Sequence, residues 1–156
     1  MHTWQTRTFT EQATAVRRAV VPTGLLADWV PRACVEIGDW LYRQGTAPCG
    51  YPFARHHPLH DGFVDVEAGF PVAVPIIADG LIEPSALPGG PVLVVRYAGP
   101  YEQIGTVQQT IDDWLHEEDA DRAGESWEVY RELSARGRLG RRIEVVQPIT
   151  FAHVLV

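Results

Sequence analysis

Cysteines and long hydrophobic runs are scarce in this chain of 156 residues. Cys34 and Cys49 are too few for a disulfide framework, and neither belongs to a Cys-x-x-Cys pair. No run approaches the roughly 20 apolar residues that a membrane-spanning helix requires. The first residues, Met1 to Gln5, lack the basic and then apolar order of a signal peptide. We therefore expect a soluble cytoplasmic protein with reduced thiols.

Positive charge is also scarce. The chain has 13 Lys and Arg against 20 Asp and Glu, a formal net charge of −7. Nucleic-acid binding depends on clustered basic side chains that displace counterions from phosphates. The one basic cluster, residues 136–142, is interpreted as a solvated turn. A hydrophobic content of 46% supports one domain spanning residues 1–156, and we expect neither a nucleic acid nor a membrane as its direct partner.

Motifs for nucleotide or covalent chemistry are absent from the sequence, which holds no Gly-x-Ser-x-Gly, no phosphate-binding loop and no dinucleotide fingerprint. The segment from His56 to Asp61 contains three histidines, but Pro58 and the following Asp-Gly pair are typical of a hairpin loop. Its spacing differs from that of a helical two-histidine metal motif. We expect no metal and no cofactor.

The sequence does contain an internal repeat. Residues 39–41, Asp-Trp-Leu, recur at 113–115, and residues 52–56 align with 126–130 at the same offset of 74. Residues 66–72 align with 143–149 at an offset of 77, which indicates hairpin loops of different length. The two copies cover about 13–75 and about 90–150, and such a duplication determines the fold prediction.

Hydrophobic periodicity gives both copies the same order of elements. Apolar positions at helical spacing predict a helix from about Trp29 to Arg43, with Asp28 or a neighbour as its N-cap because Pro31 suits a first turn. A second helix contains Ile104 to Leu115. Strands are predicted near 13–21, 50–56, 62–68, 91–97, 126–131 and 141–149. We expect an α+β fold of two β-α-β-β units, with antiparallel sheets, both helices on one face and a central cleft on the pseudo-twofold axis.

One difference between the copies points to a site. In the paired strands Glu128 aligns with Ala54, and the neighbouring positions are aromatic or histidine in both copies: Phe53 with Trp127, and His56 with Tyr130. A buried carboxylate costs several kcal/mol unless it is paired or protonated. It then serves to hold a cation or, with a raised pKa, to act as an acid or base. Alternation alone leaves open that Glu128 faces solvent.

Two further glutamates, Glu67 and Glu144, occupy equivalent positions in the repeat. Symmetry allows the two carboxylates to converge on one central cleft. A glutamate that faces outward, or one that pairs with Arg55, Arg141 or Arg142, explains each of them equally well, so these interpretations stay open.

Aromatic residues divide into two groups. Trp40 and Trp114 lie on apolar helix faces and are expected in the core. The others lie beside the divergent strand or at the mouth of the second helix, where they could stack on a flat cation. This second group consists of Tyr97, Tyr101, Trp127 and Tyr130.

Four motifs occur in the order typical of one family. They are Val64–Val72, Leu87–Gly90, Tyr97–Tyr101 and Trp127–Tyr130. With them the chain resembles the GyrI-like family, which includes the effector-binding domains of AraC-type and multidrug-responsive regulators. The resemblance implies a duplicated β-α-β-β fold whose central cleft binds hydrophobic, often cationic, small molecules.

The resemblance also assigns roles. It implies that Glu128 is the buried acid facing the ligand and that Glu144 is a second pocket acid. Val146 stands where related domains can carry an aromatic residue, so the aromatic cage is less complete here. We therefore expect a stand-alone binder of hydrophobic cations or planar aromatics. Its expected ligand-binding residues are Glu128, Tyr130, Trp127, Tyr97, Tyr101, Glu144, Glu67, Phe53 and His56.

Two alternatives follow from the same resemblance. Some members are similar to hydrolases that open the cyclopropane of DNA-alkylating natural products. In that case Glu128 would be the general base, and Tyr130 or Tyr101 would orient the substrate. Other members resemble gyrase-inhibitory proteins, so gyrase or a separate regulator is a possible protein partner.

Overall fold

The computed structural model of the chain describes residues 2–133 and 140–151. Most of the basic segment 136–142 therefore lies outside the described residues. The two helices are α1 (Leu26–Arg43) and α2 (Thr106–Glu118). Short 3-10 turns precede them at η1 (Thr23–Leu25) and η3 (Tyr101–Gln103), and a third, η2 (His60–Gly62), lies in a hairpin loop. The strands are β1 (Thr3–Phe9), β2 (Gln12–Pro22), β3 (Phe53–Pro58), β4 (Phe63–Pro71), β5 (Glu83–Leu87), β6 (Gly90–Ala98), β7 (Ala120–Arg122), β8 (Trp127–Tyr130) and β9 (Arg142–Phe151).

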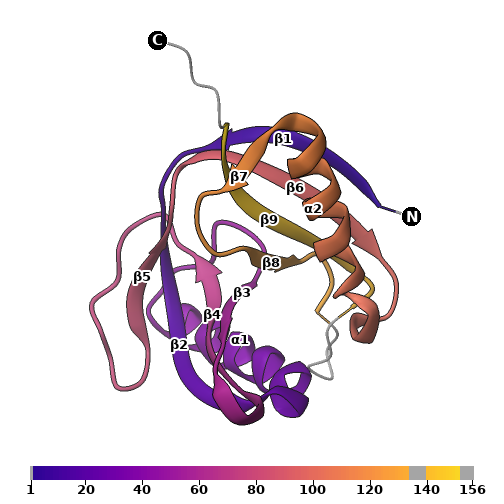
Figure 1. Cartoon of the computed structure of the whole chain (residues 1–156). Coiled ribbons are helices and arrows are strands. Elements are labelled where there is room, and N and C mark those ends of the chain that lie inside the picture. The colour runs from indigo at the N-terminus through magenta and orange to yellow at the C-terminus, as the bar shows by residue number, and fades with distance from the viewer. Residues whose placement is uncertain (1, 134–139, 152–156) are drawn as a thin grey trace.

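The strands form one curled antiparallel sheet in the order β1-β6-β9-β8-β3-β4-β2-β5, and β7 pairs with the end of β9. The central six strands form two groups of three, β6-β9-β8 and β3-β4-β2, one from each repeat and in opposite order across the sheet. The pseudo-twofold axis therefore passes between β8 and β3, which are hydrogen-bonded to each other. Figure 1 shows these two strands at the centre of the molecule.

Strand register confirms the duplication at the level of single residues. Ala54 pairs with Ala68 in the first repeat, and Glu128 pairs with Val145 in the second. These pairs are related by the same offsets of 74 and 77 that the sequence repeat shows.

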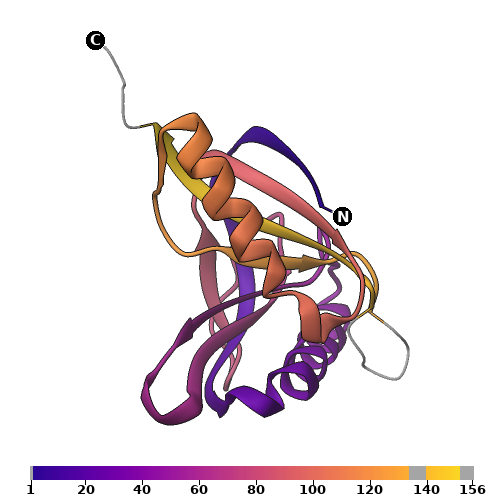
Figure 2. The same ribbon diagram turned by 45° about the vertical axis from the view of Figure 1, so that its right-hand side comes forward.

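Both helices cover one face of the sheet, as Figure 2 shows from the side. α1 packs mainly on β2 and β4, and α2 packs on β6, β7 and β9. Their apolar positions, which include Val30 and Ile111, share one buried cluster with Ala54 and Val145 of the sheet. Each helix thus lies over the outer strands of its own repeat, with the central strands β3 and β8 between them.

The start of α1 differs from the prediction. The helix begins at Leu26, so Asp28 lies in its first turn and Pro31 lies inside it. The N-cap is Leu25, which makes no side-chain capping bond. A proline this close to the start removes only the hydrogen bond to the carbonyl of Ala27, and that cost is tolerated because Pro31 is buried against the core.

The opposite face of the sheet carries its own apolar cluster, which lies inside the curl. Its members are Val16, Phe53, Leu87, Val92, Val94, Trp127 and Val146, with Phe9 and Val129 packed against them. None of the helices within the described ranges is long and apolar enough to cross a membrane.

Candidate ligand-binding site

Glu128 lies on the face of the sheet that the helices cover. Its direct cross-strand neighbours are Ala54 on β3 and Val145 on β9. Direct neighbours in a sheet share a face, and both belong to the cluster that includes residues of α1 and α2. Only 8% of Glu128 is exposed. The alternative in which Glu128 turns to solvent is therefore wrong.

The Glu128 carboxyl is surrounded by tyrosine and histidine. The Tyr130 hydroxyl donates a hydrogen bond of 2.8 Å to Oε1 of Glu128, and the Tyr101 hydroxyl also hydrogen-bonds this carboxyl. Nε2 of His56 lies 4.0 Å from Oε2. Within residues 2–133 and 140–151, no Arg or Lys lies within ion-pair distance of Glu128. Among the described residues, the carboxyl therefore has hydrogen bonds but no permanent cationic partner.

Burial dominates the electrostatics of this site. Desolvation raises the pKa of Glu128, while His56 and the two tyrosine hydroxyls act to lower it. Burial also raises the pKa of Tyr130 and of Tyr101, and the nearby Glu128 charge adds to both shifts. Both tyrosines are therefore neutral hydrogen-bond donors at ordinary pH. A ligand cation bound here would pair with Glu128 and favour the charged form of its carboxyl.

The walls of the site come from both repeats. Cys34 of α1 is fully buried, and burial raises its pKa to about 12, so its thiol is an inert part of the wall. Trp29 of α1 is half-buried against the same cluster. Cys34 and Trp29 were not predicted as site residues, although both lie on the apolar face of the predicted helix.

Tyr97 positions Tyr101 rather than presenting its hydroxyl to a ligand. The Tyr97 hydroxyl donates a 2.5 Å hydrogen bond to the carbonyl of Pro100, which precedes η3. A Cβ at Gly99 would lie 2.8 Å from the same hydroxyl, so this turn requires glycine. The buried Tyr97 ring belongs to the cluster under the helices.

Trp127 and Phe53 lie on the opposite face, so the structure does not assemble the predicted aromatic wall around Glu128. Successive side chains of a strand point to opposite faces, and Trp127 directly precedes Glu128 in β8. The two aromatic residues belong to the separate cluster inside the curl and are 2% and 1% exposed. Trp127 was assigned to the site because it is adjacent to Glu128 in sequence, and Phe53 because it is the repeat equivalent of Trp127, but both side chains lie on the other face.

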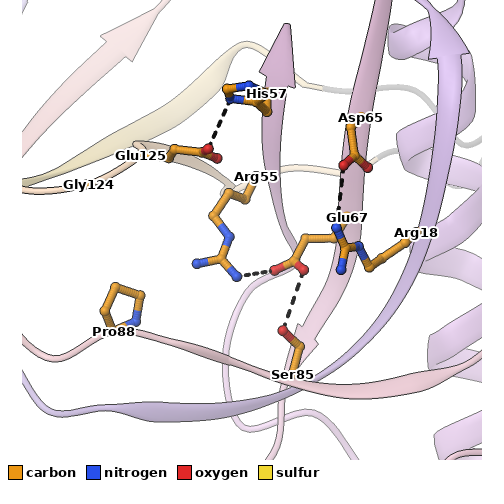
Figure 3. A pocket seen from close by; sticks show the side chains of 9 residues that line it. All are labelled: Arg18, Arg55, His57, Asp65, Glu67, Ser85, Pro88, Gly124 and Glu125. Atoms are coloured by element: carbon orange, nitrogen blue, oxygen red, sulfur yellow. Dashed lines mark hydrogen bonds and ion pairs between the residues drawn. The ribbon is translucent and has the colours of Figure 1, made fainter. Parts of the chain in front are cut away.

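Glu67 and Glu144 also face away from Glu128, and they do not converge. Strands β3 and β8 separate their strands, which places them roughly 14 Å apart at about 4.8 Å per strand. Oε1 of Glu67 lies 2.6 Å from Arg55, and Figure 3 shows this pair. Glu144 lies 2.6 Å from Arg131. Arginine pairing is thus the correct alternative for both, although the partner of Glu144 is not Arg141 or Arg142.

Each of these pairs lines a cavity. The cavity in Figure 3 measures about 520 Å³, and Arg55 and Glu67 line it. The second measures about 370 Å³ and contains Arg131 and Glu144. Glu128 lines neither of them. Across the described ranges, no three His, Cys, Asp or Glu side chains gather closely enough to hold a metal ion.

The sequence matches the family model of the GyrI-like small molecule binding domain over residues 8–138. This match covers most of the chain, so the chain belongs to the GyrI-like family. The matched part includes Glu128, Tyr130, Tyr101 and His56. No curated protein matched the sequence.

Several solved structures share the fold. The EcmrR chain in an EcmrR–DNA complex, determined by cryo-electron microscopy, aligns with a TM-score of 0.77 at 16% identity, covering 97% of this chain and 58% of EcmrR. The chain thus spans little more than half of EcmrR. The crystal structure of the EcmrR C-terminal domain alone aligns with a TM-score of 0.75 at 14% identity, covering 97% of this chain and 99% of that domain.

Two smaller proteins are also similar. SAV2435 bound to tetraphenylphosphonium aligns with a TM-score of 0.61 at 11% identity, covering 95% of this chain and 94% of SAV2435. A hydrolase from Listeria innocua aligns with a TM-score of 0.61 at 5% identity, covering 94% of this chain and 91% of the hydrolase. At these identities the similarity establishes a shared fold.

Proposed function

We propose that this domain binds a hydrophobic organic cation at Glu128, between the two helices. The observation that carries the proposal is the buried Glu128 carboxyl, which lies on the pseudo-twofold axis without an Arg or Lys partner among the described residues. Folding this carboxyl into an apolar core is costly, and a ligand cation would offset that cost. The desolvation cost of burying the Glu128 carboxyl on folding is thereby offset when the cation binds.

The walls favour an aromatic or otherwise apolar ligand body. Tyr101 and Tyr130 supply ring surfaces beside the carboxyl, and rings attract a cation through their π faces. The neutral tyrosine hydroxyls can hydrogen-bond the Glu128 carboxylate while a ligand cation packs against it. The presence of tetraphenylphosphonium, a lipophilic cation, in the structure of SAV2435 supports this ligand class.

Ligand entry requires a local rearrangement. Glu128 is 8% exposed, whereas 29% of the His56 side chain and part of Tyr101 reach the surface. The main contacts of α1 and α2 are with the outer strands, so these two side chains can swing aside without disturbing the helix packing. We infer that His56 and Tyr101 form the entrance.

The experiment is a pair of titrations with ligands of similar shape and different charge. Isothermal titration calorimetry with tetraphenylphosphonium should give saturable binding with one ligand per chain. Neutral triphenylphosphine oxide should bind at least tenfold more weakly, because each tenfold change corresponds to about 1.4 kcal/mol and a partly buried charge pair supplies this much. Equal affinity for the two compounds would contradict the proposal.

Hydrolysis of an electrophilic ligand is a second candidate. The observation that favours it is the buried Glu128 carboxyl, because burial raises its pKa and a carboxyl with a raised pKa suits a general base. The hydrogen bond from Tyr130 fixes its position. Mass spectrometry of a recovered cyclopropane-bearing compound separates the two functions. A gain of one water molecule in more than one equivalent of compound per protein demonstrates turnover, whereas intact compound supports binding alone.

Binding to gyrase or to a separate regulator stays a prediction. A pull-down with the purified domain and gyrase, performed with and without tetraphenylphosphonium, tests it. Recovery of gyrase that depends on the ligand would connect the partner to the Glu128 site.

A further inference from the structure

A third cavity, which we name the aromatic cavity, lies on the face of the sheet opposite Glu128. It measures about 480 Å³, within the range of roughly 300–1,000 Å³ that small-molecule sites occupy. Strands β1, β3 and β8 and the loop before β3 form its walls. The lining residues that define its chemistry are Arg7, Phe9, Cys49, Tyr51, Phe53 and Trp127.

The aromatic cavity provides flat apolar surfaces. Phe53 and Trp127 are almost completely buried and form its base, and the ring of Phe9 lies 6.4 Å from that of Trp127. Tyr51 is half exposed at the opening. Rings arranged in this way suit a planar aromatic group, which would stack or pack edge to face against them.

Charge distinguishes this cavity from the one in Figure 3. There, Arg18 lies 3.4 Å from Asp65 and Arg55 lies 2.6 Å from Glu67, so each of these arginines faces a carboxylate. In the aromatic cavity Arg7 is the only lining side chain that is charged at neutral pH. Its ligand would therefore meet a positive group without a neighbouring carboxylate.

The exposed Arg7 guanidinium lies over an aromatic ring, and among the described residues no carboxylate pairs with it. It lies 5.1 Å above the centre of the Phe9 ring. No carboxylate in residues 2–133 or 140–151 lies within ion-pair distance of it. A stacked guanidinium keeps its in-plane N–H donors available, and their geometry matches a carboxylate.

We propose that the aromatic cavity is a second binding site, which takes a planar aromatic carboxylate. The aromatic ring packs against the accessible rings of Phe9 and Tyr51, above the buried Phe53 and Trp127, and the carboxylate binds Arg7. The ligand class is opposite in charge to that proposed at Glu128. Because Trp127 and Glu128 are consecutive residues of β8, the two sites lie back to back on the same strand.

A cysteine reports directly on this site. Cys49 is exposed and lines the aromatic cavity, whereas Cys34 is fully buried with a pKa raised to about 12. Alkylation of the folded protein by iodoacetamide therefore measures access to Cys49. We expect saturating 2-naphthoate to slow this alkylation at least fivefold and neutral 2-naphthamide to require at least tenfold higher concentration, because it cannot pair with the guanidinium.

Two variants test the role of the charge. Arg7→Gln should weaken the protection by 2-naphthoate about tenfold and abolish its advantage over 2-naphthamide. Arg32→Gln, which removes the same charge from an exposed position on α1, should leave the protection unchanged. Both positions are exposed, so both variants are expected to fold.

Three results would overturn the proposal. The first is Cys49 alkylation that 2-naphthoate does not slow at any concentration up to its solubility. The second is equal protection by 2-naphthamide in the unmodified chain, and the third is an equal loss in Arg7→Gln and Arg32→Gln. Tetraphenylphosphonium should not protect Cys49, which keeps this test independent of the Glu128 site.

Discussion

Ala54 and Glu128 are equivalent positions of the two repeats, and they are also direct cross-strand partners. A pseudo-twofold axis must therefore pass between them. Directly opposed residues have Cβ atoms about 4.5–5.5 Å apart, so glutamate at both positions would bring two buried carboxylates into repulsion. The small Ala54 side chain leaves room for Glu128 on the axis. The symmetric fold thus favours different residues at this one pair of equivalent positions.

Replacing Glu128 tests the charge argument. Glu128→Gln keeps the shape and a hydrogen-bond acceptor for Tyr130 but removes the negative charge. We expect the affinity for tetraphenylphosphonium to fall at least tenfold by calorimetry. Glu144→Gln makes the same chemical change on the opposite face and should change the affinity less than twofold. Equal losses in the two variants would show that overall charge, rather than Glu128, attracts the cation.

Binding of the cation should strengthen as pH rises. Burial raises the pKa of Glu128 in the free protein, so below that pKa the cation must displace a proton. The dissociation constant should fall by up to about tenfold per pH unit in this range and level off above the pKa. In Glu128→Gln this dependence should disappear. A dissociation constant that rises with pH would contradict the assignment.

The fold was largely predictable because the duplication carries two independent signals. The aligned strands and the helix periodicity predicted the two β-α-β-β units and the equivalence of their positions. The strands β1, β5 and β7 were not predicted, since β1 is an almost fully exposed edge strand and β5 contains Pro84. β7 has only three residues. Short or exposed strands lack the apolar alternation that identifies a buried strand.

The site was predictable only in part. Comparison of the repeats pointed to Glu128, Tyr130 and His56, and the structure brings these three together. Trp127 was assigned to the same site because it is adjacent in sequence, but the two faces of a strand are indistinguishable without knowing which elements pack on them. Tyr101 was also assigned to the site from the sequence, whereas the position of Cys34 of α1 beside the site comes only from the tertiary structure.

The stability of the free protein should also depend on Glu128. Its pKa is raised on folding, above about 4.3 in the unfolded chain. Its contribution is therefore fully present below pH of about 4.3 and is lost as pH rises through the folded pKa. The unfolding free energy of the unmodified chain, minus that of Glu128→Gln, should fall by up to about 1.4 kcal/mol per pH unit in that window. Urea unfolding at a series of pH values measures this difference, and a flat or rising difference would contradict it.

Gly69 of β4 lies so close to the backbone of β2 that no side chain fits at this position. It pairs with Val16 on one side and Phe53 on the other, and an added Cβ would overlap the carbonyl oxygen of Ala15. We expect Gly69→Ala to reduce the unfolding free energy by about 3 kcal/mol, since the backbone of β2 must shift. Gly24→Ala is the control, because no atom lies within 4 Å of its added Cβ. Similar urea midpoints for the two variants would show that β2 yields easily.

The hydroxyl of Tyr101 should set the pH at which the Glu128 site becomes charged. Its hydrogen bond to Glu128 acts to lower the pKa of that carboxyl. In Tyr101→Phe this pKa should therefore rise further, and the pH profile of tetraphenylphosphonium binding should move to higher pH while the affinity at high pH changes little. Tyr42→Phe removes the same hydroxyl from an exposed site on α1 and should leave the profile in place. A profile that moves to lower pH in Tyr101→Phe would mean that Tyr101 stabilises the protonated carboxyl, and the hydrogen bond would then run from Glu128 to Tyr101.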